Sequence, residues 1–264
     1  MLNSYKTICV CNTMFYMSSL IINFDTFDHS FCESTVFSNG REYINCSTAL
    51  FISFVGWFGL VMNPPEDNTV FLYHTLVING ITSALYHYTH YIGWGLMDRY
   101  SMILIAVYCF KIFFTVFDIV RVRNYHFIKF LSVLYLTCIQ TVTGLHQETH
   151  FNNMFGGVLI SIVVFLFKVR NSSYSICPAL LTLAFKGMFL IKIGGILWIL
   201  TENFCKTTGI TKYLFGHGFW HICVALGGYY ISLLPVYIKH KERMTELRIK
   251  YKLSLPYLSN TPNR

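Results

Sequence analysis

Residues 215–238, FGHGFWHICVALGGYYISLLPVYI, form an apolar run that contains no Lys, Arg, Asp or Glu. A membrane-spanning helix needs roughly 20 mostly apolar residues, so this stretch is long enough to be one. His217 and His221 lie near its start, four residues apart. On a helix that spacing places both side chains on the same face. The run therefore predicts a membrane helix with two imidazoles on one side.

Six further runs of similar length and composition precede it. They cover residues 45–62, 69–90, 94–117, 126–145, 151–167 and 178–201. The runs do not alternate as transmembrane β-strands do, and the connections between them are short. We therefore predict an all-α, polytopic membrane protein, a seven-transmembrane-helix bundle over 45–238 within a single membrane domain of residues 1–264. The apolar residues 8–24 fit a signal peptide, an interfacial helix or an eighth span, and we expect a segment that does not span.

The composition agrees with a chain whose solvent is lipid. Hydrophobic residues make up 54% of the 264 residues and charged residues 12%. Soluble domains average about 25% charged residues, and disordered chains are less hydrophobic still. The net charge of +8 is carried mainly by short loops and the C-terminal tail. We therefore expect a membrane environment and no nucleic-acid partner.

The positions of the basic residues predict the topology. Arg121 and Arg123 follow the third run, Lys168 and Arg170 follow the fifth, and a basic tail occupies 239–264. With seven spans these segments share one side, which the positive-inside rule places in the cytosol. The N-terminal segment, 1–44, then faces the lumen, and the C-terminus lies in the cytosol.

A candidate metal site follows from this topology. His87 ends the second run on the side where His217 and His221 begin the seventh, and three histidines plus a water are common at catalytic zinc. Ser83 shares a helix face with His87, and Asp98 opens the third run at the same end. Because an isolated charge is costly in lipid, Asp98 needs a partner. We predict that these five residues converge on a zinc hydrolase site. The alternative is that the histidines only form hydrogen bonds with water at the membrane interface and that Ser83 only packs between helices.

The cysteines and two lysines leave further questions open. The chain has nine cysteines, an odd number, so no complete disulfide framework is implied. Cys32 and Cys205 lie on the predicted lumenal side, where oxidation is possible, and either a bridge or two free thiols fits them. Lys186 and Lys192 lie inside the sixth run, and we assign them no function.

At these residues the chain resembles the alkaline ceramidases, which belong to a superfamily of seven-span hydrolases and receptors. The resemblance rests on SALYH at 83–87, Asp98 eleven residues after His87, and HGFWH at 217–221. It implies zinc bound by His87, His217 and His221, with Ser83 and Asp98 catalytic. The substrate it implies is ceramide from the bilayer, cleaved at its amide to a sphingoid base and a fatty acid. It also implies an endoplasmic reticulum or Golgi membrane, and the oligomeric state stays open.

The N-terminal segment resembles the family less closely. The family binds calcium there, and the equivalent positions in this chain are Ser30, Phe31, Glu33, Thr35 and Glu42. Ser30, Phe31 and Thr35 replace the family's Asp, Trp and Asn. Calcium takes six to eight oxygen ligands, so these losses weaken the expected site. Cys32 and Cys205 match a pair that the family bridges, which implies a disulfide here.

Three other functions remain open at this point. A receptor of the progestin and adipoQ type keeps the same zinc residues, and a cytosolic N-terminus would favour it. A di-iron desaturase or hydroxylase would use the histidine boxes 87–90, 146–150 and 217–221, which hold six histidines. Such enzymes usually have eight, including adjacent pairs, and no His-His pair occurs in this sequence. The third alternative is an inactive structural member of the superfamily.

Overall fold

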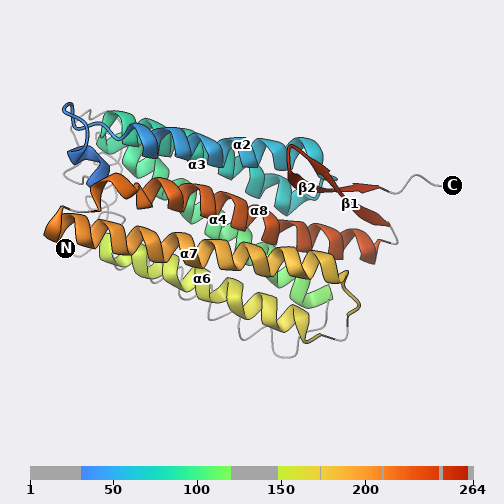
Figure 1. Cartoon of the computed structure of the whole chain (residues 1–264). Coiled ribbons are helices and arrows are strands. Elements are labelled where there is room, and N and C mark those ends of the chain that lie inside the picture. The colour runs from blue at the N-terminus through green and yellow to red at the C-terminus, as the bar shows by residue number, and fades with distance from the viewer. Residues whose placement is uncertain (1–30, 120–147, 173, 210, 244–245, 261–264) are drawn as a thin grey trace, which may run out of the picture.

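The computed structural model describes residues 31–119, 148–172, 174–209, 211–243 and 246–260. The predicted span 126–145 and the segment 8–24 lie outside these residues. The described chain is mostly helical, and its long helices lie side by side in one bundle (Figure 1). These helices are α2 (Tyr43–Met62), α3 (Asp67–Thr89), α4 (Ile92–Ile119), α6 (Glu148–Arg170), α7 (Pro178–Thr208) and α8 (Gly216–Glu242).

Each helix matches one of the apolar runs predicted from the sequence. Four of them, α2, α4, α7 and α8, are long and apolar enough to cross a membrane. The helix α3 is more polar, because buried residues such as Thr75, Asn79 and Ser83 lie along it. The four candidate spans support an integral membrane protein. The expectation of seven spans is not settled by the described residues.

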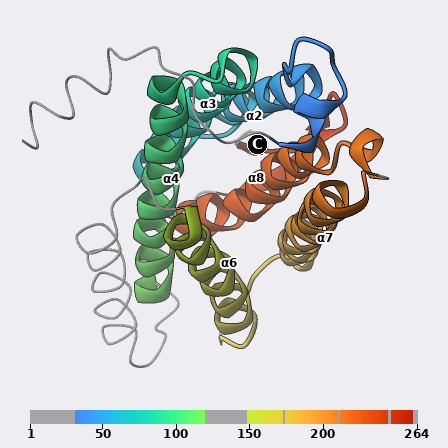
Figure 2. The same cartoon turned by 90° about the vertical axis from the view of Figure 1, so that its left-hand side faces the viewer.

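Helix α8 lies at the centre of the bundle. Viewed from the end, it lies between α7 and the group formed by α2, α3 and α4 (Figure 2). Of the apolar stretch of α8 that could cross a membrane, 67% is buried inside the protein, whereas the corresponding value for α7 is 22%. Tyr229, Leu233, Leu234 and Ile238 are fully buried along it. Side chains on α8 are therefore largely shielded from lipid, including those near its start.

Two glycines allow α7 and α8 to pack closely. A Cβ atom added to Gly187 would lie 2.5 Å from the carbonyl oxygen of Gly227, and the reverse distance is also 2.5 Å. No side chain fits at such separations, and small residues at helix contacts are typical of membrane proteins. This contact fixes α8 against α7 and so helps to position the start of α8.

A β-hairpin caps the bundle end opposite the start of α8 (Figure 1). Strands β1 (Leu247–Lys252) and β2 (Leu255–Asn260) pair antiparallel through a turn at Leu253 and Ser254, both with positive φ. Leu258 donates its N–H to Asn63 Oδ1 at 3.0 Å, which ties the hairpin to the end of α2. The sequence predicted only a basic tail here, whereas α8 extends to Glu242 and the hairpin follows.

The N-terminal segment packs over the other end of the bundle. A short 3₁₀ helix, η1 (Cys32–Thr35), is joined to α7 by a disulfide between Cys32 and Cys205, which confirms the predicted pair. The Glu33 carboxylate accepts hydrogen bonds from the backbone N–H groups of Ile44 and Asn45 at the start of α2. The segment is thereby fixed at the bundle end where α8 begins.

Candidate metal centre

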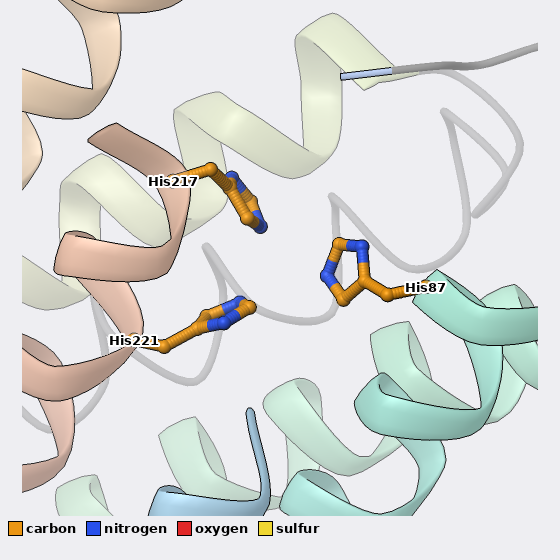
Figure 3. Close-up of side chains that lie close together, drawn as sticks. All are labelled: His87, His217 and His221. Carbon is orange, nitrogen blue, oxygen red and sulfur yellow. The ribbon is translucent and has the colours of Figure 1, made fainter. Parts of the chain in front are cut away.

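Three histidines from two helices meet inside the bundle. His87 lies in the last turn of α3, and His217 and His221 lie in the first turns of α8. All are buried, at 1%, 7% and 4% exposure. One possible ligand atom from each lies within 4.8 Å of the other two. Figure 3 shows the rings converging on a common point, in agreement with the prediction that these histidines converge.

The start of α8 owes its position to Gly216. The preceding residue, Phe215, has a left-handed backbone with φ of 48°, so the chain turns sharply into the helix. A Cβ atom on Gly216 would lie 1.8 Å from Thr201 Oγ1 of α7. Glycine is therefore required where α8 begins against α7, one residue before His217.

Glu42 orients the first of these imidazoles. Its Oε2 lies 2.5 Å from His87 Nδ1, and Asn45 Nδ2 donates to the same oxygen at 3.1 Å. Burial works to raise the pKa of Glu42, but the hydrogen bonds that its carboxylate accepts from His87, Asn45 and the Phe31 N–H outweigh it and hold the pKa below its ordinary value. A carboxylate accepts hydrogen bonds, so Nδ1 of His87 carries the hydrogen and Nε2 is left with a lone pair that could bind a metal ion.

The other two imidazoles also have neighbours that hold them. His221 Nδ1 lies 3.2 Å from Thr48 Oγ1 of α2. The His217 ring lies 3.9 Å from the Phe31 ring and 5.0 Å from the Trp198 ring, centroid to centroid. Buried, oriented imidazole nitrogens at this spacing suit zinc, which prefers nitrogen and sulfur ligands in a tetrahedral arrangement. The residues present therefore fit a zinc ion.

A cavity of about 170 Å³ opens below the three histidines. Ser83 and Asp98 line it together with all three imidazoles. Its other walls are mostly apolar and come from α2, α3, α4, α6, α7 and α8, with Ile52, Leu72, Ile105, Val158, Ile191 and Val224 among them. The structure thus brings the five predicted residues to one cavity, and the polar groups lie at its head.

Asp98 has the hydrogen-bond partners that a buried carboxylate requires. Asn79 Nδ2 donates to its Oδ1 at 2.8 Å, and the Ser83 hydroxyl is a second hydrogen-bond partner of this side chain. Asn79 was not among the residues predicted from the sequence. Its signal was available, because Asn79 precedes Ser83 by four residues and so lies on the same helix face.

The residues expected to bind calcium make other contacts. Ser30 lies outside the described residues. Glu33 and Glu42 accept from the donors described above, and the Phe31 carbonyl accepts from the N–H and hydroxyl of Ser34. The Thr35 hydroxyl donates to the Cys32 carbonyl at 2.8 Å. Oxygens that already face N–H and O–H donors fit calcium poorly.

The fold and this centre define an integral membrane protein whose buried histidine cluster could hold a metal ion at the head of an apolar cavity. The family model for ceramidases matches residues 25–259, and the chain belongs to the ceramidase family. No curated protein matches the chain. Membership implies a hydrolase that acts on ceramide amides, and it favours neither the receptor nor the di-iron alternative.

Proposed function

We propose that this chain is a zinc-dependent intramembrane amidohydrolase that cleaves ceramides into a sphingoid base and a fatty acid. The observation that carries the proposal is the convergence of His87, His217 and His221 at the polar head of an apolar cavity. A lipid amide combines polar and apolar parts in the same way as the cavity, because its polar linkage joins two hydrocarbon chains. Family membership supports the same substrate class.

The three imidazoles would hold the zinc ion, and Glu42 would keep His87 in the required orientation. When bound, zinc supplies Lewis-acid chemistry that makes water nucleophilic near neutral pH. Phe31 and Trp198 pack against His217 and limit access of bulk water from that side. The protein's remaining contribution is to position the amide and to move protons.

Asp98 and Ser83 are the groups that we assign to proton transfer and charge stabilisation. Asp98 takes a proton from the attacking water and returns it to the nitrogen as the carbon–nitrogen bond breaks. The Ser83 hydroxyl bonds the Asp98 side chain in the free protein. Once Asp98 has taken up the proton, this hydroxyl turns to donate to the negative charge that develops on the carbonyl oxygen, a role typically worth about 3 kcal/mol. The products are a carboxylic acid and a free amine.

The apolar walls of the cavity would accept hydrocarbon chain from the substrate. Ile105 of α4, Val158 of α6 and Val224 of α8 lie among these walls. The substrate then stays among apolar groups throughout, which avoids the cost of exposing its chains to water. With the topology inferred from the loop charges, the site lies near the lumenal side of an endoplasmic reticulum or Golgi membrane.

The test is mass spectrometry of lipids after the purified protein, reconstituted in bilayer discs, is incubated with mixed ceramides. We expect release of sphingoid base and fatty acid in equal amounts, loss of this release after metal stripping, and recovery on addition of zinc. Asp98→Ala should lower the rate by at least about 100-fold. A zinc-loaded, folded protein that releases neither product would refute the proposal.

A further inference from the structure

Asn79 lies outside the sequence motifs described above, yet its side chain makes three polar contacts in the bundle. The residue lies in α3, is 6% exposed and lines the same cavity as Ser83 and Asp98. Its Nδ2 lies 2.8 Å from Asp98 Oδ1, 2.9 Å from Ser101 Oγ and 3.4 Å from the Asp98 carbonyl oxygen. All three contacts cross from α3 to α4, so the amide connects the two helices at this point.

The chemistry of these partners fixes the direction of the hydrogen bonds. The Asp98 carboxylate and carbonyl are acceptors, so the Asn79 nitrogen, and not its oxygen, must face them. The two short contacts use the two hydrogens of the amide. Ser101 in turn donates its hydroxyl to the Asp98 carbonyl at 2.7 Å. Asn79, Asp98 and Ser101 therefore form a closed network of hydrogen bonds.

Two buried threonines of α3 behave differently from Asn79. The Thr75 hydroxyl donates to the Phe71 carbonyl at 2.8 Å, and the Thr82 hydroxyl donates to the Ile78 carbonyl at 3.0 Å. Both bonds lie within the helix. An asparagine amide is costly to bury in an apolar bundle unless it is hydrogen-bonded. The two N–H groups of Asn79 donate to the Asp98 carboxylate and to the Ser101 hydroxyl.

We propose that Asn79 is a positioning residue that, together with Ser101, holds the Asp98 carboxylate in the orientation needed for proton transfer. The inference rests on the proposed role of Asp98 in ceramide hydrolysis. An aspartate side chain rotates about two bonds, and anchoring Oδ1 fixes the direction in which the second oxygen points. Misplacing a reacting group by about 1 Å can cost about 100-fold in rate.

The test compares Asn79→Leu, which keeps the branched shape of the side chain but removes both donors, with Thr75→Val as a matched control on the same helix. Zinc content, kcat and KM are measured for both purified variants on a ceramide in bilayer discs. For Asn79→Leu we expect kcat to fall by about 10- to 100-fold, with KM within about twofold and zinc content unchanged. Thr75→Val should match the wild type in all three.

Ser101→Ala provides a second route if Asn79→Leu does not fold. We expect a smaller fall in kcat with KM and zinc content unchanged, and the double variant should be no slower than Asn79→Leu, because both act through one network. Wild-type kcat in Asn79→Leu or in Ser101→Ala, or a parallel loss of zinc, would overturn the inference. Asp98→Asn separates the two proposals: if it keeps wild-type kcat, the proposed role of Asp98 is wrong; if it is inactive while Asn79→Leu is not, only this inference is wrong.

Discussion

The Glu42 carboxylate and the His87 imidazole lie 2.5 Å apart, between Oε2 and Nδ1, and both residues are 1% exposed. The contact joins the residue just before α2 to the last turn of α3. The backbone N–H of Glu42 also donates to the His87 carbonyl at 3.4 Å. Glu42 in turn accepts from the Phe31 N–H at 2.9 Å. The N-terminal segment is therefore part of the structure that orients His87 in the candidate metal centre.

Replacing Glu42 should weaken metal binding without removing a ligand. We expect Glu42→Gln to lower the zinc affinity by about 10- to 100-fold, because a neutral amide oxygen is a weaker acceptor than the carboxylate that orients the imidazole and raises its basicity. Titration against a competing zinc chelator measures this directly. Glu66→Gln, at the other end of the bundle, serves as the control and should bind zinc as the wild type does. Equal affinities in the two variants would contradict the role given to Glu42.

The calcium content of the protein should be low. The carboxylates of Glu33 and Glu42 face hydrogen-bond donors of the chain itself, and the Thr35 hydroxyl donates to the Cys32 carbonyl. We therefore expect elemental analysis of protein purified in the presence of calcium to find far less than one calcium ion per chain. We also expect added calcium to leave the thermal midpoint unchanged. A full equivalent of bound calcium would show that these side chains rearrange around the ion.

The disulfide between Cys32 and Cys205 should stabilise the bundle. It closes a sequence separation of 173 residues and fixes η1 to the end of α7. We expect Cys32→Ser to lower the free energy of unfolding by about 2–4 kcal/mol, measured by thermal or denaturant unfolding under non-reducing conditions. Cys177→Ser, which changes a free cysteine, is the matched control. A wild-type midpoint for Cys32→Ser would mean that the bridge contributes little.

The pair formed by Glu66 and Lys239 should make stability depend on pH. Burial alone raises the pKa of Glu66, but hydrogen bonds from Lys239 and Thr69 outweigh it, so the pKa lies below its ordinary value of 4.5. A carboxylate with a lowered pKa stabilises the fold above pH 4.5, and this contribution is lost as the pH falls through the folded-state pKa.

Thermal midpoints measured from pH 7 downward check this expectation. Glu66→Gln should have a lower midpoint than the wild type at pH 7, and the difference should shrink below pH 4.5. Asp67→Asn, which changes the neighbouring exposed carboxylate, should follow the wild-type curve. A difference that stays constant over the whole pH range would exclude the ion pair as its source.

Much of the described fold could be predicted, because a helix that crosses a membrane requires a long run of apolar residues that is visible in the sequence. The run 94–117, for example, lies inside α4, which extends only two residues beyond it at each end. The hairpin could not be read in the same way. Its turn at Leu253 and Ser254 lacks the glycine or asparagine that usually marks such turns. Its buried residues, Leu255 and Leu258, are covered by contacts with distant parts of the chain.

In the candidate site, too, some residues could be predicted from the sequence and others could not. His217 and His221 are four residues apart, so a local rule places them on one face, and loop charge placed His87 at the same depth. Asn79 and Asp98 are 19 residues apart on different helices. Whether their side chains meet depends on how α3 and α4 pack, which no spacing within either helix reveals. Glu42 had a ready interpretation as a calcium ligand, and only the fold shows its contact with His87.

The most direct test of the account is the zinc content of the purified protein, measured by elemental mass spectrometry for the wild type and for His221→Ala. We predict about one zinc ion per wild-type chain and almost none in the variant, because two imidazoles alone do not form a structural or catalytic zinc site. Circular dichroism should show that the variant keeps its helices. A wild-type protein without zinc, or a variant that retains a full equivalent, would contradict the central claim.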